Sequence, residues 1–159
     1  MDSLGLEGRC GVDGLPRSSG ATLEVQLVAV VPLPPGYHSV NPYFVVEHAE
    51  RFIDFLIAVF DGSEQGEREV RADGGIDHAD VMIGDSVVMI SEASLTYPAR
   101  PSVAFAYVDD VDATYARALT EGSRSIFDPA DQTWGDRVAG IFDPFDNRWW
   151  IGTHLRDFS

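Results

Sequence analysis

Hydrophobic and polar positions follow the same order twice along the chain. Residues 41–46 form an extended apolar segment, and apolar side chains then recur at helical spacing over residues 47–60. Residues 102–108 form a second extended segment, followed by residues 109–121 with apolar positions on one face. A glycine comes close behind each predicted helix, as at many helix ends. The pattern predicts two strand–helix units.

A predicted hairpin follows each strand–helix unit. Residues 79–91 alternate in the manner of two strands around a turn at Gly84-Asp85. Residues 139–153 do the same around a longer turn over residues 143–147, which is rich in Asp, Pro and Asn. The second half of the chain therefore predicts the same succession of elements as the first.

The repeat keeps its register from one half to the other. Val46 corresponds to Val108 and Gly84 to Asp146, in both cases 62 residues apart. The sequence thus predicts an α+β protein of two tandem βαβββ modules. A sheet with a helix on one face leaves its other face in need of a partner, so we expect neither module to be stable alone.

We expect a first module over residues 37–98 and a second over residues 99–159, preceded by an N-terminal extension over residues 1–36. Within the extension, residues 1–21 are rich in Gly and Ser, which predicts a flexible leader. Residues 23–31 alternate and predict a strand, either an extra edge strand or an ordered piece of the tail.

The chain is strongly acidic. It has 26 Asp and Glu against 11 basic residues, all of them Arg, for a formal net charge of −15. Such a field repels phosphate backbones and anionic lipids, which argues against nucleic acids and membrane surfaces as partners. Neutral or cationic ligands are tolerated better, although solubility alone would also explain the acidity.

Nothing in the sequence predicts export or a membrane anchor. Cys10 is the single cysteine, so an internal disulfide is impossible. The longest apolar run, residues 27–33, is interrupted by Pro32 and is too short to span a bilayer. The first residues also lack the basic start of a secretory signal. We expect a cytoplasmic protein.

Several segments resemble the PhnB-like branch of the vicinal oxygen chelate superfamily, which includes glyoxalase I, extradiol dioxygenases, fosfomycin-modifying enzymes and bleomycin-binding resistance proteins. The most specific are Trp-Gly-Asp-Arg at 134–137 and Asp-Pro-Phe at 143–145. The others are residues 37–46, 52–55, 78–80 and 83–89, with Trp149 and Thr153-His154. The resemblance implies two modules whose curved mixed sheets enclose a cup, often completed across a homodimer.

The resemblance also implies where a divalent metal ion would be held. By alignment the two first-strand ligand positions are Asn41 and Val103, and the two last-strand positions are near Val88 and at Trp150. A valine has no lone pair, and an indole nitrogen only donates. We therefore expect no metal and no other cofactor, with an atypical divalent metal site as the alternative.

Aromatic and branched side chains replace the implied metal ligands. If the first strand of each module presents alternate residues to the cup, that surface suits a flat, largely apolar small molecule. The alternative is that these aromatic side chains fill a closed core. The expected ligand-binding residues are Asn41, Tyr43, Val88, Val103, Phe105, Tyr107, Trp134, Arg137 and Trp150.

Arg137 has two interpretations: it clamps a polar group of the ligand, or it forms a structural ion pair with Asp136 that holds a long loop. The candidates for acid–base chemistry are His78, His154 and Glu92. No two histidines have the close spacing of a metal site on one helix.

We therefore expect a metal-independent protein that holds an apolar or aromatic small molecule and forms a homodimer. The first alternative is a lyase, isomerase or dioxygenase relative that uses an atypical metal site or metal-free acid–base chemistry. The second is a dimeric interaction module with a filled cup.

Overall fold

The computed structural model describes residues 32–157. The predicted leader over residues 1–21 and the predicted strand over residues 23–31 lie outside the described residues. No helix in the described segment is both long and apolar enough to cross a bilayer.

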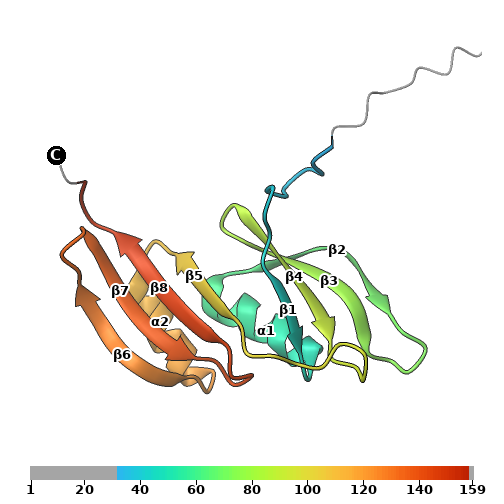
Figure 1. Cartoon of the computed structure of the whole chain (residues 1–159). Helices are drawn as coiled ribbons and strands as arrows, with labels where there is room; N and C mark the ends of the chain where they lie inside the picture. Colours follow the sequence, from blue (N-terminus) through green and yellow to red (C-terminus); the bar gives the residue numbers. More distant parts are fainter. Residues whose placement is uncertain (1–31, 158–159) are drawn as a thin grey trace, which may run out of the picture. The chain divides into compact units, whose positions relative to one another are not determined.

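The first module contains one helix and a four-stranded mixed sheet in the order β1-β4-β3-β2 (Figure 1). β1 and β4 are parallel, and the other neighbours are antiparallel. Its elements are β1 (Tyr43–Val46), α1 (Ala49–Phe60), β2 (Ser63–Val70), β3 (Ile76–Ile83) and β4 (Ser86–Glu92).

The second module repeats this topology, with a sheet in the order β5-β8-β7-β6 and a parallel β5–β8 pair. Its elements are β5 (Val103–Tyr107), α2 (Val111–Thr120), β6 (Arg124–Asp131), β7 (Asp136–Phe142) and β8 (Arg148–His154). The predicted fold, two mixed sheets with two helices in tandem βαβββ order, is confirmed.

Each sheet has a helix-facing side and an open face. In β1, Phe44 and Val46 are buried on the helix-facing side, whereas Tyr43 points to the open face and is 47% exposed. In β5 the open face carries Val103, Phe105 and Tyr107, the three exposed residues of an alternating strand. This is the period of two expected from the sequence.

The helix-facing sides of the two modules share one core. The rings of Phe44 on β1 and Trp149 on β8 stack at 5.2 Å between centroids, with an angle of 7° between their planes. The ring of Phe60, at the end of α1, contacts the same indole, with 4.7 Å between the ring centroids. Arg117 of α2 also donates two hydrogen bonds to the carbonyl of Val59. The modules are therefore joined by packing as well as by the chain.

Three aspartates shape helix ends and a turn. Asp61 ends α1 in the left-handed region, with φ 54°, and Asp146 adopts the same conformation in the β7–β8 turn. The side chain of Asp110 caps α2 by accepting a hydrogen bond from the Ala113 N–H at 3.0 Å. Leu119, one of the apolar positions in the helix predicted over residues 109–121, is 39% exposed, and the buried face of α2 consists of Val111, Thr114, Tyr115 and Ala118.

The ladders show how the two modules correspond. Tyr43 pairs with Met89 across β1 and β4, and Phe105 pairs with Trp150 across β5 and β8. Met89 therefore holds in the first module the place that Trp150 holds in the second. Val88 lies on the opposite side of β4, buried in the core.

Candidate functional site

The open face of the second sheet carries a cluster of aromatic rings from three strands. Phe105 and Tyr107 on β5 are 4.8 Å apart between ring centroids. Trp150 on β8 stacks on Phe127 of β6 at 5.5 Å. Phe105 and Trp150 are ladder partners, which places the two pairs next to one another. We call these four residues the aromatic face.

Two glycines give the rings the space they occupy. A Cβ at Gly140 would come within 2.7 Å of both Phe127 and Trp150. A Cβ at Gly152 would come within 2.8 Å of the Phe105 ring. Since neither glycine has a positive φ, its role is close approach and not an unusual backbone conformation. The rings therefore lie close against the neighbouring strands.

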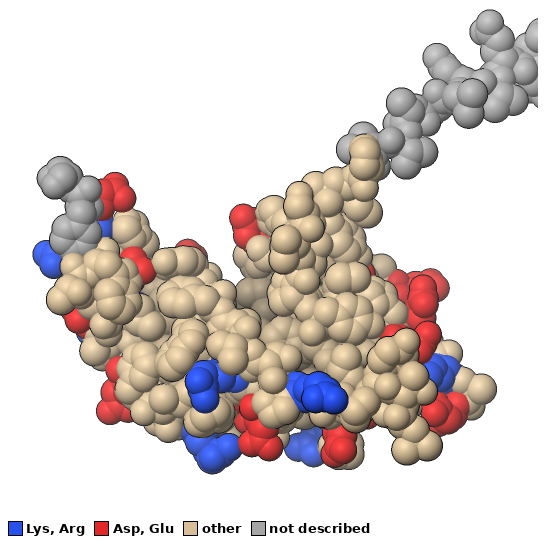
Figure 2. All heavy atoms as spheres, viewed as in Figure 1, with Lys and Arg blue, Asp and Glu red and all other residues tan. Residues whose placement is uncertain are grey.

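The aromatic face is open to solvent in the single chain. Phe105 is 46% exposed and Tyr107 62% exposed, so each could bury about half of its surface or somewhat more against a ligand or partner. In Figure 2 the surface over β5, β7 and β8 is mostly uncharged, and charged side chains gather along its lower edge in that view. Such a surface can accept a flat apolar ligand or a partner chain.

A hydrogen-bonded polar cluster adjoins the aromatic face and is centred on the buried carboxylate of Asp136. Oδ2 accepts hydrogen bonds from the Tyr107 hydroxyl at 2.9 Å and from the Trp134 indole N–H at 3.1 Å. Oδ1 lies 2.7 Å from Nδ1 of His154, whose Nε2 is 3.0 Å from Asp157.

The hydrogen bonds of the polar cluster shift the pKa values of its members. The bond from His154 is the main reason that the pKa of Asp136 lies below its usual value. The same bond, and a second one with Asp157, raise the pKa of His154. Donation to Asp136 raises the pKa of Tyr107. The half-exposed imidazole is therefore held by two carboxylates, of which Asp136 contributes more to raising its pKa.

Arg137 does not pair with Asp136. The two residues are neighbours on β7, so their side chains point to opposite sides of the sheet. The Arg137 guanidinium instead donates to Asp112 at 2.6 and 2.9 Å and to Asp131 at 2.8 Å. These bonds keep its pKa above the usual value. Its donors are committed to two carboxylates on the helix-facing side.

The open face of the first sheet carries a separate, more polar group. Nε2 of His78 lies 3.2 Å from Oδ1 of Asp80, and the His78 ring is 6.1 Å from that of Tyr43. The hydroxyl of Tyr37, from the segment before β1, donates to the other carboxylate oxygen of Asp80. Asn41 is engaged locally, since its side chain both accepts from and donates to the backbone of His38.

Glu92 lies at the end of β4 and caps α1. Its two carboxylate oxygens accept hydrogen bonds from the N–H groups of His48 and Ala49, both at 2.8 Å. Thr153 does the same for α2, since its hydroxyl accepts from Val111 at 2.9 Å. The structure therefore gives the Glu92 side chain a structural role at a helix N-terminus.

The residues at the implied metal-ligand positions do not fit a divalent ion. The Asn41 amide is engaged by His38, Val103 has no donor atom, and the Trp150 nitrogen only donates. The ladder places Met89 at the remaining position, and a thioether is a poor ligand for a hard cation. Within residues 32–157, no group of three His, Cys, Asp or Glu is arranged to hold a metal ion.

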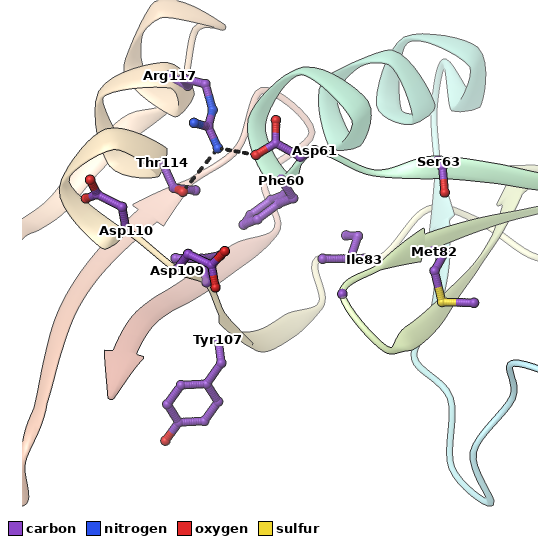
Figure 3. Close-up of a pocket in the computed structure, with 12 residues that line it drawn as sticks. Phe60, Asp61, Ser63, Met82, Ile83, Tyr107, Asp109, Asp110, Thr114 and Arg117 are labelled. Carbon is purple, nitrogen blue, oxygen red and sulfur yellow. Dashed lines mark hydrogen bonds and ion pairs between the residues drawn. The ribbon is translucent and has the colours of Figure 1, made fainter. Parts of the chain in front are cut away.

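Val88 and Phe105, which belong to different modules, line a common cavity of about 200 Å³ together with Tyr107 and Trp149. This cavity lies where the start of β4 faces β5. A larger, more polar cavity of about 450 Å³ lies nearby, between the end of α1 and the start of α2. Figure 3 shows Arg117 there, directed at Asp61 and Thr114, whereas Tyr107 points away from them.

Sequence reasoning missed the parts of the site that depend on strand pairing. Phe127, Gly140 and Gly152 become part of it only because β6, β7 and β8 are neighbours. The sequence indicates Asp136 only as a possible ion-pair partner of Arg137. The available signal was alternation along β7, which separates Asp136 from Arg137 and places Gly140 on the same side as Asp136.

Residues 37–151 match the sequence model of the Glyoxalase/Bleomycin resistance protein/Dioxygenase superfamily. Uncharacterized proteins of Mycobacterium bovis and Mycobacterium tuberculosis are each 33% identical over 132 residues, covering 76% of this chain and 86% and 77% of their own.

Solved structures with a similar fold include TioX from Micromonospora sp. ML1, with 22% identity over 77% of this chain and 100% of that one and a TM-score of 0.60. The antibiotic binding protein TnmS3 from Streptomyces sp. CB03234 has 20% identity over 80% and 98%, with a TM-score of 0.57. The fosfomycin resistance protein FosX from Mesorhizobium loti has 21% identity over 74% and 92%, with a TM-score of 0.52. At these identities the similarity shows the fold alone.

Proposed function

Because the chain belongs to the Glyoxalase/Bleomycin resistance protein/Dioxygenase superfamily, we propose that it binds an apolar or aromatic small molecule without a metal ion. Within the superfamily we assign it to the PhnB-like branch. The observation that carries the proposal is the aromatic face: four rings seated over two glycines and open to solvent. That the similar protein TnmS3 binds an antibiotic supports this choice.

The donor set supports binding without a metal. The implied ligand positions hold an engaged amide, a valine, a thioether and an indole, none of which suits a hard divalent ion. Aromatic pairs contribute about 0.5–1.5 kcal/mol each beyond the burial of area, so a fused-ring ligand that stacks on Phe105 and Trp150 gains affinity from both. The Tyr107 hydroxyl, whose oxygen can still accept a hydrogen bond, and the half-exposed His154 ring would orient polar substituents.

The proposal includes a cytoplasmic homodimer. The open faces of both sheets expose large side chains in the single chain, Tyr43 on the first and Phe105 on the second. A second copy that covers them would enclose the ligand. Light scattering after size exclusion should give twice the 17.4 kDa chain mass. A monomer at micromolar concentration would contradict this part of the proposal.

The direct test is an NMR titration with neutral aromatic amides of one to three fused rings, such as 2-naphthamide. We expect the indole N–H signal of Trp150 to shift with saturation, and the affinity to rise with ring number. Chelator-treated protein should bind equally well. The absence of any shift for all these amides would overturn the proposal, and restoration of binding by added Zn²⁺ or Mn²⁺ would overturn its metal independence.

A second candidate is an enzyme that uses metal-free acid–base chemistry, favoured by the Asp136–His154 pair. A carboxylate that holds one imidazole nitrogen orients the ring for proton transfer. The His154 side chain is 52% exposed and lines a surface cavity with Tyr107. An aromatic ligand on the adjoining face would bring a polar substituent close to this ring.

This candidate is tested by proton exchange. 1-Tetralone in D₂O should gain deuterium at its α-carbon faster with protein than with buffer alone, and a His154→Gln variant should abolish the difference. Exchange at the buffer rate, from a protein that binds the ketone, would overturn the enzyme and leave the binding function in place.

A further inference from the structure

Arg148 lies on the aromatic face, at the opposite end of β8 from His154. It pairs with Val103 in the β5–β8 ladder and with Phe142 in the β7–β8 ladder, so its side chain shares the open face with theirs. The guanidinium carbon lies 5.3 Å from the centroid of the Phe142 ring and 5.8 Å from that of Trp150. The cation lies within cation–π distance of both rings.

No described carboxylate pairs with Arg148. Carboxylates are in excess over guanidiniums in this chain, with 26 acidic residues and 11 basic ones. Other guanidiniums of the described residues form ion pairs: Arg68, Arg71, Arg117, Arg124 and Arg137. Arg51 and Arg100 also lack an ion pair, but they lie outside the second sheet. Arg148 is thus the unpaired cation on the face where we place the ligand.

The contacts of Arg148 leave its hydrogen-bonding edge free. A cation–π contact uses the flat face of the guanidinium, whereas its five N–H donors point outward in the guanidinium plane. A carboxylate binds to that edge in a bidentate geometry, so both kinds of contact can form together. The two ring contacts restrict the Arg148 side chain and so reduce the entropy lost when an anion binds.

Arg148 and Trp150 are two residues apart on one strand, a separation of about 7 Å. A fused-ring system stacked on Trp150 and Phe105 would therefore bring a ring substituent to the guanidinium edge. An anionic substituent on the ligand would then form an ion pair with Arg148, which no described carboxylate of the chain forms.

We infer that the ligand is an aromatic anion, whose rings stack on Phe105 and Trp150 and whose carboxylate, or another planar acidic group, is bound by Arg148. This inference rests on the proposed binding function and specifies its ligand class. The net charge of −15 repels anions in general, so a preference for an anion must come from a local cation.

The test compares 2-naphthoate with 2-naphthamide, which has the same rings and no charge, by NMR titration in 0.15 M salt. We expect wild-type protein to bind the naphthoate about five-fold more tightly, which is the upper range for a solvent-exposed ion pair. Arg148→Met should reduce this ratio to one or below, while Arg148→Lys should keep part of it.

Arg124→Met is the matched control. It removes the same charge from the same face, where Arg124 lies 5.2 Å from the centroid of the Phe142 ring, but that guanidinium already pairs with Asp146. We expect it to keep the five-fold ratio. Equal affinities for the two probes in wild-type protein, both with Trp150 shifts, would overturn the inference and leave the binding function intact. Failure of both probes to bind would overturn both proposals.

Discussion

The ring of Phe105 lies over Gly152, so closely that a Cβ on the glycine would be 2.8 Å from the ring Cζ. Phe105 comes from β5 and Gly152 from β8, and the two strands are parallel neighbours. The aromatic face therefore requires glycine, which has no side chain, on the strand next to the rings. Gly140 has the same relation to Trp150 and Phe127.

Gly140→Ala should destabilise the protein by about 1–3 kcal/mol, the usual cost of overpacking a well-packed site. Gly140 is buried, and the added methyl group would meet Phe127 and Trp150 at once. Urea unfolding measures the loss. In a Phe127→Ala background the cost should fall, since one of the two clashing rings is gone. Strictly additive costs would contradict this packing relation.

Asp143→Ala should cost about 3 kcal/mol or more. The carboxylate is 1% exposed and accepts hydrogen bonds from the N–H groups of Phe145 and Asn147, the Asn147 amide and the Trp149 indole. Its removal leaves buried donors without acceptors. Thermal and urea unfolding should agree on the loss, and Asp157→Ala, at an exposed carboxylate near the C-terminus, is the control that should stay near wild type. A small loss for Asp143→Ala would contradict the buried network.

The His154–Asp136 pair should make stability depend on pH. The folded pKa of His154 is raised, so its contribution is fully present below the unfolded value of about 6.5 and is lost as pH rises through the folded pKa. The folded pKa of Asp136 is lowered, so its contribution is lost in acid as pH falls through that value. The stability difference between wild type and His154→Gln should therefore shrink from pH 6 to pH 9.

An NMR titration of the imidazole checks the cause. Asp136→Asn should return the His154 pKa toward its usual value, and Asp157→Asn should lower it less, because the Asp136 bond is shorter and contributes more. An unchanged pKa in Asp136→Asn would show that the pair does not form in solution.

The fold could be predicted because apolar residues recur about every two residues in the strands and about every 3.6 residues in the helices. These two patterns follow one another in the same order in both halves of the chain. Alternation also placed Val103, Phe105 and Tyr107 together on one face of β5, as the structure has them. Asp and Asn tolerate left-handed backbone geometry, and Asp61 at the end of α1 and Asp146 in the β7–β8 turn adopt it.

A constant spacing of 62 residues does not extend to the last strands. The β3–β4 ladder closes on Ile83 and Ser86, whereas the β7–β8 ladder closes on Phe142 and Arg148. With turns of different length, Trp150 corresponds to Met89, and the one-residue difference moves Val88 to the core side. Ladder register depends on such turns and on pairing across the sheet, which a single sequence does not specify.

The most direct measurement for the account as a whole is the affinity of 2-naphthamide for Trp150→Ala, compared with wild type and with Tyr97→Ala. Tyr97 is an exposed aromatic residue, 69% accessible, in the segment between β4 and β5 and outside the aromatic face. We predict at least a ten-fold loss for Trp150→Ala with the fold retained by circular dichroism, and no change for Tyr97→Ala. Unchanged affinity in Trp150→Ala would place the ligand elsewhere and contradict the account.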